Sequence, residues 1–164
     1  MGKKICVIGA GPAGIFASCI AASRGLDVTL LEKNSKIGRK LFITGKGRCN
    51  ITNGAPIDEF FDNIITNRNF LYSSLYSFTN EDVISLLKRY GLETKIERGN
   101  RIFPQSDKSS DVIKSLDKFI NDNGVKLKLN STVKNIFYSE DQFYLKVNEE
   151  SMRFDGVIIA TGGK

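Results

Sequence analysis

The residues with the clearest chemical purpose form a glycine turn near the start of the sequence. Gly9-Ala10-Gly11-Pro12-Ala13-Gly14 matches the pattern GxGxxG, directly after an apolar run and directly before a helical pattern. In this pattern Gly9 allows the tight turn, Gly11 lets a pyrophosphate approach bare backbone, and Gly14 lets the helix pack on the strand. The N–H groups of the first helical turn, where Ala13 lies, are then available to phosphates. These four residues predict a dinucleotide-binding turn.

An acidic residue follows at the distance that this chemistry requires. Glu32 stands eighteen residues after Gly14, at the end of a second strand-like run. A carboxylate there can accept hydrogen bonds from both ribose hydroxyls of an adenosine. Because it would repel a 2′-phosphate, FAD or NAD is favoured over NADP. The alternative for these residues is a plain glycine turn followed by a surface glutamate.

A basic loop begins at Lys33, which we count among the cofactor-binding candidates. The sixteen residues from Lys33 to Arg48 contain six cations and no acid, and they carry the whole formal excess of 24 Lys+Arg over 18 Asp+Glu, which is +6. Such a local charge suits a local polyanion better than a surface coated with nucleic acid. The alternative is a solvated lysine-rich loop.

Composition excludes several other kinds of site. The 164 residues contain no histidine, which excludes Ser-His-Asp and Cys-His nucleophiles and His-ligated zinc, and we expect no metal site. The three cysteines have no CxxC spacing, which argues against a disulfide framework and favours a reducing cytoplasm. No apolar stretch reaches the roughly 18 residues of a membrane span, so we expect a soluble cytoplasmic protein without a membrane partner.

The turn and the acid need a strand–helix–strand unit to position them. The patterns predict a strand at Ile5 to Ile8, a helix at Ala13 to Ser23 and a strand at Asp27 to Leu31. This βαβ unit covers residues 1–33, and its crossover should be right-handed. The loop from Glu32 to Asn53 shows no periodicity that supports a regular element.

The remaining patterns predict an insertion and then more β structure. We expect the insertion at about residues 34–124, with helices at Asn67 to Ser77, from the N-cap Asn80 to Gly91 and at Ser110 to Asn121, and a hairpin of Thr94 to Glu97 with Arg101 to Phe103 turning at Gly99-Asn100. Residues of about 125–164 should form strands at Val125 to Leu129, Val133 to Tyr138, Phe143 to Val147, Met152 to Phe154 and Val157 to Ala160. The middle three of these make a β-meander.

This order of elements resembles the glutathione-reductase-like flavoproteins. A simple NAD-binding domain continues with another βα unit, whereas here a meander precedes a strand that ends in Ala160-Thr161-Gly162-Gly163. The resemblance implies an α/β fold, a Rossmann-like FAD-binding domain with a parallel sheet, a β-meander and a helical and hairpin insertion. It also implies backbone contacts from Val133 to the adenine, and places Thr161 and Gly162 near the phosphate and ribose of the cofactor.

A second block of sequence resembles a narrower family. The run from Gly38 to Asn53, GRKLFITGKGRCNITN, together with Arg101 to Ser106 and Asp111-Val112, is similar to the BaiN-type flavoproteins, which include aminoacetone oxidases and bile-acid ring reductases. Asn100 departs from this family's pattern, where glycine is expected, but Asn also accepts a positive φ. The resemblance implies that FAD is held by Arg39, Lys40, Gly47, Arg48, Cys49 and Asn50.

The residues leave the catalytic groups unknown. Cys49, flanked by Arg48 and Lys46, can be a thiol of lowered pKa that acts in redox chemistry, although such a residue is more often a small packing group. Cys6 and Cys19 are expected in the core. No general acid or base stands out from the sequence.

We therefore expect the N-terminal portion of an FAD-dependent oxidoreductase, active when intact and inactive as an isolated fragment. The family's later FAD segment and substrate domain would lie beyond these residues. The expected partner is a small-molecule substrate, with NAD(P)H a further candidate as reductant, and no nucleic acid. The alternatives are an NAD-dependent dehydrogenase domain, a non-catalytic remnant, and an RNA-binding module that uses the basic loop.

Overall fold

The chain folds as two compact units. The computed structural model describes residues 2–163, so the first and last residues of the expected domain, 1–164, lie outside the described part. One unit contains the chain up to Leu41 and again from Leu116 onward, and the other contains Phe42–Ser115. The limits of the second unit lie within the insertion that the sequence predicts at about residues 34–124.

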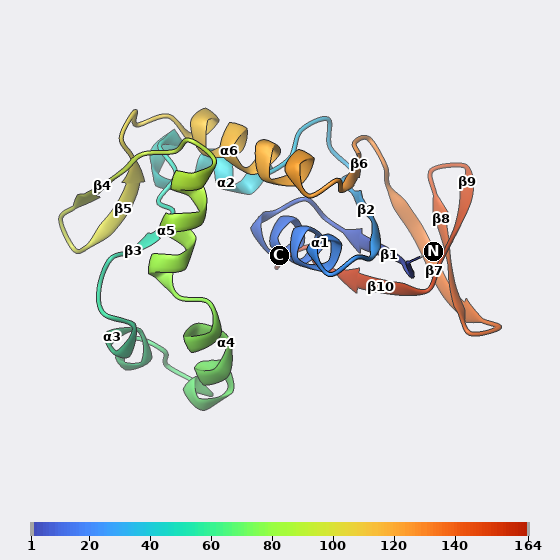
Figure 1. The fold of residues 1–164 in the computed structure, drawn as a ribbon, viewed down its shortest axis with the longest axis horizontal. Helices are drawn as coiled ribbons and strands as arrows, with labels where there is room; N and C mark the ends of the chain where they lie inside the picture. Colours follow the sequence, from blue (N-terminus) through green and yellow to red (C-terminus); the bar gives the residue numbers. More distant parts are fainter. Residues whose placement is uncertain (1, 164) are drawn as a thin grey trace. The chain divides into compact units, whose positions relative to one another are not determined.

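The first unit is built on a parallel sheet, which confirms the Rossmann-like α/β fold (Figure 1). The sheet has the order β10-β1-β2-β6. Its strands are β1 (Lys4–Ile8), β2 (Asp27–Leu31), β6 (Lys126–Lys128) and β10 (Gly156–Ile159). Helix α1 (Pro12–Ser23) connects β1 to β2. Ile8 pairs with Leu31 on one side and with Ile159 on the other, so the carboxyl ends of three strands meet at one edge.

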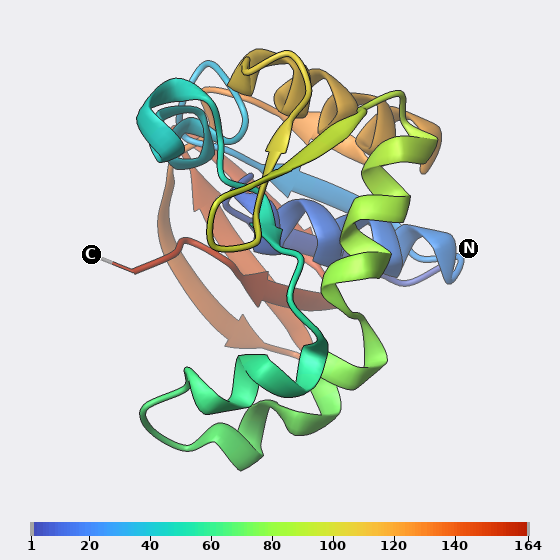
Figure 2. The same cartoon turned by 90° about the vertical axis from the view of Figure 1, so that its left-hand side faces the viewer.

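A β-meander covers one face of this sheet. It consists of β7 (Val133–Ser139), β8 (Gln142–Val147) and β9 (Glu150–Phe154), paired antiparallel as expected. Its buried side chains pack with sheet residues in one core cluster: Cys6, Ile8, Leu31, Leu145, Val147 and Phe154. Figure 2 shows α1 lying along the parallel strands, with the meander strands beyond them.

Helix α6 (Ser109–Asp122) starts in the second unit and ends in the first. Within the first unit the ring of Phe119 meets that of Phe16 edge to face, with centroids 5.5 Å apart. The Cys19 thiol donates to the Phe119 carbonyl at 3.6 Å. Cys6 and Cys19 are fully buried, as the sequence predicts. Burial raises the pKa of Cys6 to about 12 and that of Cys19 to about 11.

Strand β10 forms one edge of the parallel sheet. Among the described residues it pairs only with β1. Strands of parallel sheets are usually covered on both faces, yet Ile158 is 39% exposed and Ile159 is 68% exposed. Within residues 2–163, β10 therefore leaves one main-chain edge unpaired and presents two exposed isoleucine side chains.

The second unit combines a small antiparallel sheet with short helices. The sheet has the order β3-β5-β4 and is formed by β3 (Thr52–Asn53), β4 (Thr94–Glu97) and β5 (Arg101–Pro104). The helical elements are the end of α2 (Arg39–Ile43), η1 (Thr44–Gly47), α3 (Ile57–Asp62), η2 (Arg68–Leu71), α4 (Tyr72–Ser77) and α5 (Asn80–Arg89). Gly99 and Asn100 both have positive φ, 75° and 56°, which confirms the predicted hairpin turn.

Three local expectations were wrong. The loop to Asn53 contains α2, η1 and β3, which are too short to show periodicity in sequence. The helix expected at Asn67 to Ser77 is split into η2 and α4, and Asn67 has a left-handed φ of 51°.

The third correction concerns the start of α5. Its N-cap is Thr79, whose hydroxyl accepts a hydrogen bond from the Asp82 N–H at 3.2 Å, while the Asp82 carboxylate accepts from the Thr79 N–H at 2.7 Å. This capping box lowers the pKa of Asp82. Asn80 instead donates to the carbonyls of Asn53 and Ala55, at 2.7 and 3.0 Å.

Within residues 2–163 no helix is both long and apolar enough to cross a membrane.

Candidate cofactor-binding site

The glycine turn has the geometry that its sequence predicts. Gly9 has a φ of 103°, and a Cβ there would lie 2.6 Å from the Ala160 carbonyl oxygen. A Cβ at Gly14 would lie 1.8 Å from the Gly9 oxygen and 3.3 Å from the Ala160 side chain. Both positions therefore need glycine because the backbone packs tightly around them.

Gly11 differs from its two neighbours. Its φ of −79° suits any residue, and a Cβ there would meet nothing within 4 Å. The protein itself therefore gives no reason for glycine at this position, whereas a ligand that needs bare backbone does. Open space in front of Gly11 is the feature that fits a dinucleotide pyrophosphate.

Gly11 is also the N-cap of α1, a helix of 12 residues with no side-chain cap and no acid in its first turn. The Ile15 N–H donates to the Gly11 carbonyl at 3.0 Å. The N–H groups ahead of that bond, which include that of Ala13, have no partner within the helix. Together with the helix dipole they favour an anion, and Ala13 is exposed to receive one.

Glu32 points back at the glycine turn. One of its carboxylate oxygens accepts a hydrogen bond from the Ala10 N–H at 2.8 Å. The other accepts from the backbone N–H and the side-chain amide of Asn34, at 2.9 and 2.6 Å. The side chain is buried, with 8% of the residue exposed. A carboxylate has about four acceptor positions, so the three bonds fix its orientation and leave capacity for a ribose hydroxyl.

The end of β10 and the start of α2 lie at the same edge of the sheet. The Gly38 N–H donates to the Ala10 carbonyl at 2.8 Å. Arg39 donates to the Asn34 side chain at 3.0 Å, and Lys40 donates to the Gly163 carbonyl at 2.5 Å. Beside Lys40, Gly162 has a φ of 76°. The first unit thus brings Lys40 to the turn that contains Thr161 and Gly162, both exposed, and ties Arg39 to Asn34.

The two further candidates in the first unit are Lys33 and Val133. Lys33 is exposed beside Glu32. Val133, the first residue of β7, is half-buried and packs against the core cluster of the sheet and meander. The Ser131 N–H donates to the Glu32 carbonyl at 2.8 Å. The segment that leads into Val133 therefore starts next to the Glu32 backbone.

The other four candidates belong to the second unit, which is described by itself. Gly47 is exposed, has a φ of 84°, and has open space where a Cβ would stand. The Asn50 amide, turned so that its nitrogen faces carbonyls, donates to Thr52 at 3.1 Å and to Ile102 at 3.3 Å. Part of the Asn50 hydrogen-bonding capacity is therefore used to hold the start of β3 to β5.

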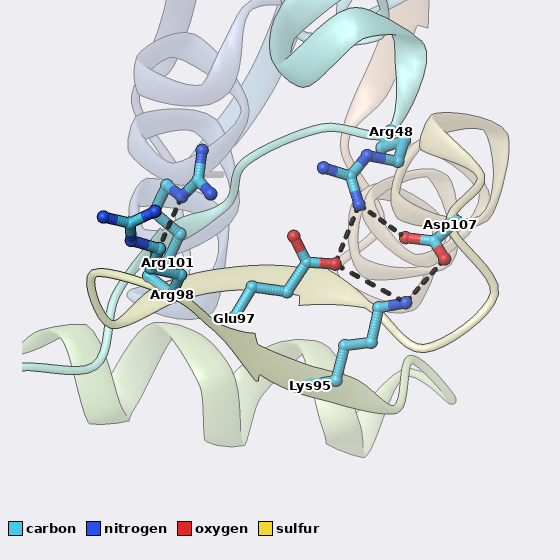
Figure 3. Close-up of polar contacts among 6 residues, drawn as sticks. All are labelled: Arg48, Lys95, Glu97, Arg98, Arg101 and Asp107. Atoms are coloured by element: carbon cyan, nitrogen blue, oxygen red, sulfur yellow. Dashed lines mark hydrogen bonds and ion pairs between the residues drawn. The ribbon is translucent and has the colours of Figure 1, made fainter.

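Arg48 makes ion pairs with acids of its own unit (Figure 3). Its guanidinium donates to Glu97 at 2.8 Å and to Asp107 at 3.2 Å. Lys95 lies between the same carboxylates, 2.5 Å from Asp107 and 3.7 Å from Glu97. The guanidinium carbon also lies 4.2 Å from the centre of the Phe103 ring. These partners gave no signal in the sequence, because they lie 49 and 59 residues from Arg48.

Cys49 has the environment of a packing residue. It is 1% exposed, and its N–H donates to the Thr44 carbonyl at 3.0 Å. Burial raises the pKa of its thiol, and a hydrogen bond with Thr44 opposes that shift only in part. Neighbouring cations therefore do not activate this thiol, and the structure gives no support to a redox role. Within residues 2–163 no group of three His, Cys, Asp or Glu side chains can hold a metal ion.

Asn34 is a residue that the sequence did not single out. It bonds both Glu32 and Arg39 and so links the acid to the basic loop. A short amide two residues after the acid is the signal that could have identified it, because Asn often hydrogen-bonds its local backbone and neighbours.

Comparison with known proteins finds relatives over nearly the whole chain. The family described as HI0933-like protein Rossmann domain matches residues 3–164. A ribosomal RNA dihydrouridine synthase of Escherichia coli is 32% identical over 162 residues, which are 96% of this chain and 38% of that protein. A 3-dehydro-bile acid delta(4,6)-reductase of Clostridium scindens is 32% identical over 164 residues, 99% of this chain and 39% of that protein. The chain thus spans about two-fifths of the length of these relatives.

Solved structures are similar in fold. The Diels-Alderase PyrE3 of pyrroindomycin biosynthesis superposes with a TM-score of 0.61 at 11% identity, over 98% of this chain and 32% of PyrE3. FqzB superposes with a TM-score of 0.57 at 17% identity, over 98% of this chain and 36% of FqzB. At such low identity these likenesses show the fold alone.

Proposed function

The chain belongs to the HI0933-like Rossmann-domain family, an FAD-binding domain of flavoprotein oxidoreductases, and from this premise we propose that it binds the ADP portion of FAD at the glycine turn of its first unit. In the intact protein it then forms the cofactor-binding part of a flavin-dependent oxidoreductase. The open space in front of Gly11, at the N-terminus of α1, is the observation that carries this proposal.

The roles of individual residues follow from their positions. The N–H groups at the start of α1 bind the pyrophosphate, because they have no helical partners. Glu32, oriented by Ala10 and Asn34, binds the ribose hydroxyls of the adenosine. Arg39 and Lys40 offset the phosphate charge, and the segment that leads to Val133 borders the adenine.

Bound FAD supplies hydride transfer, and the protein supplies recognition and orientation. We propose that the intact protein reduces a carbon–carbon double bond of a ring by adding a hydride and a proton, and that FAD, held by the N-terminus of α1 with Glu32, Arg39 and Lys40, would supply the hydride. The names of both relatives support this class of reaction, since one makes dihydrouridine and the other is a delta(4,6)-reductase. NAD(P)H is the proposed reductant.

We propose a small-molecule substrate in preference to a nucleic acid. Arg48, one of the six cations of the basic loop, is paired with two acids of its own unit. This pairing lowers the net charge that the loop offers to a phosphodiester backbone, the main source of nucleic-acid affinity.

The test is the identity and affinity of the nucleotide held by the intact protein. We expect protein purified from cells to release FAD on denaturation, as read by chromatography and flavin absorbance. Gly11→Val should leave the urea unfolding curve of the apoprotein unchanged but weaken FAD binding at least about 100-fold, because the new side chain fills the space that bare backbone leaves open. Release of NAD instead, or FAD affinity unchanged by Gly11→Val, would overturn the proposal.

A further inference from the structure

The loop from Thr44 to Asn50, which contains the end of the basic loop and lies in the second unit, has an unusual backbone. Gly45, Lys46 and Gly47 have φ values of 57°, 57° and 84°, and Cys49 follows at 65°. For Lys46 and Cys49 this left-handed region is unfavourable, and residues keep it only where surrounding contacts fix them. Something in the fold must therefore hold this loop in shape.

Backbone contacts hold the inner side of the loop. The Arg48 N–H donates to the Gly45 carbonyl at 3.2 Å, and the Cys49 N–H donates to the Thr44 carbonyl at 3.0 Å. Gly45 packs closely against Phe103 and the Asn50 backbone, since a Cβ at Gly45 would lie 2.8 Å from the Phe103 ring and 2.9 Å from the Asn50 nitrogen. The loop thus closes tightly on β5.

The Arg48 side chain provides the second set of contacts that hold the Thr44–Asn50 loop. Its guanidinium lies over Phe103, on β5, and bonds Glu97, on β4, and Asp107, just after β5. Arg48, Glu97, Asp107 and Lys95 make a group of two cations and two anions, so their charges balance (Figure 3). A guanidinium with two carboxylate partners and a ring below it is geometrically fixed.

Lys46, two residues earlier, differs from Arg48. It is exposed, and none of the ion pairs formed within residues 2–163 involves it. The loop therefore contains one cation that is committed to the fold and one that is available to an external anion.

We propose that Arg48 is a positioning residue, which Glu97 and Asp107 use to hold the Thr44–Asn50 loop in its cofactor-binding shape, and that Lys46 provides the positive charge which this loop offers to the cofactor. This inference rests on the proposed FAD-binding function. It reassigns Arg48 from a phosphate ligand, which its place in the basic loop favours, to a structural side chain.

The test compares Arg48→Lys, Arg48→Ala, Glu97→Gln and Lys46→Gln in the intact protein. In the apoprotein, Glu97→Gln and both Arg48 variants should speed hydrogen exchange of the Cys49 amide about three- to tenfold, the modest range expected for exposed ion pairs. FAD affinity should fall by a similar factor for the same three variants. Glu97→Gln added to Arg48→Ala should cost little more, because the contact that both remove is already lost and only the longer Lys95–Glu97 pair, at 3.7 Å, remains to be broken.

Lys46→Gln should give the opposite pattern. It should leave exchange of the Cys49 amide unchanged and weaken FAD binding with a reduced dependence on salt, as loss of an exposed charge does. Glu93→Gln is the matched control, because it breaks the exposed Lys88–Glu93 pair of the same unit, whose atoms are 3.8 Å apart. It should change neither exchange nor affinity.

Two results would overturn the proposal. If Arg48→Lys binds FAD like the wild type, charge alone suffices at this position. If Glu97→Gln tightens FAD binding, Arg48 is a phosphate ligand that Glu97 restrains. The exchange measurements need no cofactor, so a wild-type protein that fails to bind FAD would refute the proposed function while amide exchange still decides whether Glu97 holds Arg48 and the loop.

Discussion

Two glycine-rich loops of this protein reach their shapes by different means. The turn from Gly9 to Gly14 is fixed by its own backbone, packed so closely that a Cβ at Gly14 would collide with a carbonyl oxygen at 1.8 Å. The loop from Thr44 to Asn50 has backbone bonds of its own, and it is held in addition by side chains from other parts of the chain, above all Glu97 and Asp107 around Arg48.

The difference predicts which kind of substitution disrupts the shape of each loop. A shape set by close backbone packing fails at once when a methyl group is added, because backbone atoms cannot move aside cheaply. A shape set by half-exposed ion pairs weakens gradually, because water and salt compete with each contact. The first loop should therefore respond to sterics, and the second to charge as well as to sterics at Gly45.

The largest effect is expected where the first loop is tightest. Gly14→Ala should destabilise the protein by at least about 3 kcal/mol, because the new Cβ overlaps the Gly9 oxygen. Urea unfolding measures this loss. Gly11→Ala is the control, with open space at its Cβ, and should leave the unfolding free energy within about 0.5 kcal/mol of wild type. Equal losses in the two variants would show that packing does not define this turn.

A second substitution separates charge from shape within the first unit. Glu32→Gln keeps the size of the side chain but replaces one carboxylate oxygen with an NH₂ group. That group cannot accept the hydrogen bonds that Ala10, Asn34 or a ribose hydroxyl would donate. We expect FAD affinity to fall about tenfold or more, measured by calorimetry. Unchanged FAD affinity would mean that Glu32 stabilises the glycine turn but does not bind the ribose.

The Cys49 thiol gives a third measurement. Because burial raises its pKa, the thiol should stay protonated at pH 8.5. Alkylation by iodoacetamide, followed by mass spectrometry, should be at least about tenfold slower at Cys49 in the folded protein than in urea. Rapid labelling of the folded protein would indicate that the side-chain contacts of this loop open often.

The smallest effect is a response of the second loop to acid. Lys95 and, less strongly, Arg48 lower the pKa of Asp107. Its carboxylate therefore contributes stability that is complete above its unfolded pKa, about 3.9, and is lost as pH falls through the lowered folded value. Exchange of the Cys49 amide, corrected for its intrinsic pH dependence, should stay constant from pH 7 to about 5 and rise only below about pH 4. Faster exchange of the Cys49 amide between pH 7 and 5, after the same correction, would contradict this role of Asp107.

The parts of the structure that depend on local patterns could be predicted from the sequence. The βαβ unit and its glycine turn follow from Gly9, Gly14 and the apolar strands, whose roles need only neighbouring backbone. The meander follows from alternation in β7 and β8, and the hairpin from Gly99-Asn100, because positive φ is a property of the residue type.

The parts that depend on distant residues could not be predicted. Arg48 sits in a run of cations that suggests a phosphate ligand, and no local rule reveals that Glu97 and Asp107 will neutralise it. The N-cap of α5 was missed by one position, because Thr79 and Asn80 are both good caps and a tertiary bond from Asn80 to Asn53 and Ala55 decides between them.

The edge of β10 that pairs with no strand within residues 2–163 also has a practical consequence. Main-chain N–H and C=O groups along the edge strand of a sheet lack hydrogen-bond partners within the sheet. In β10 the side chains of Ile158 and Ile159 add exposed apolar surface beside these groups. Any extended peptide that reaches it gains a ladder of bonds together with apolar burial. Preparations of these 164 residues alone should consequently self-associate as their concentration rises, and a charged replacement such as Ile159→Lys should keep them monodisperse in light scattering.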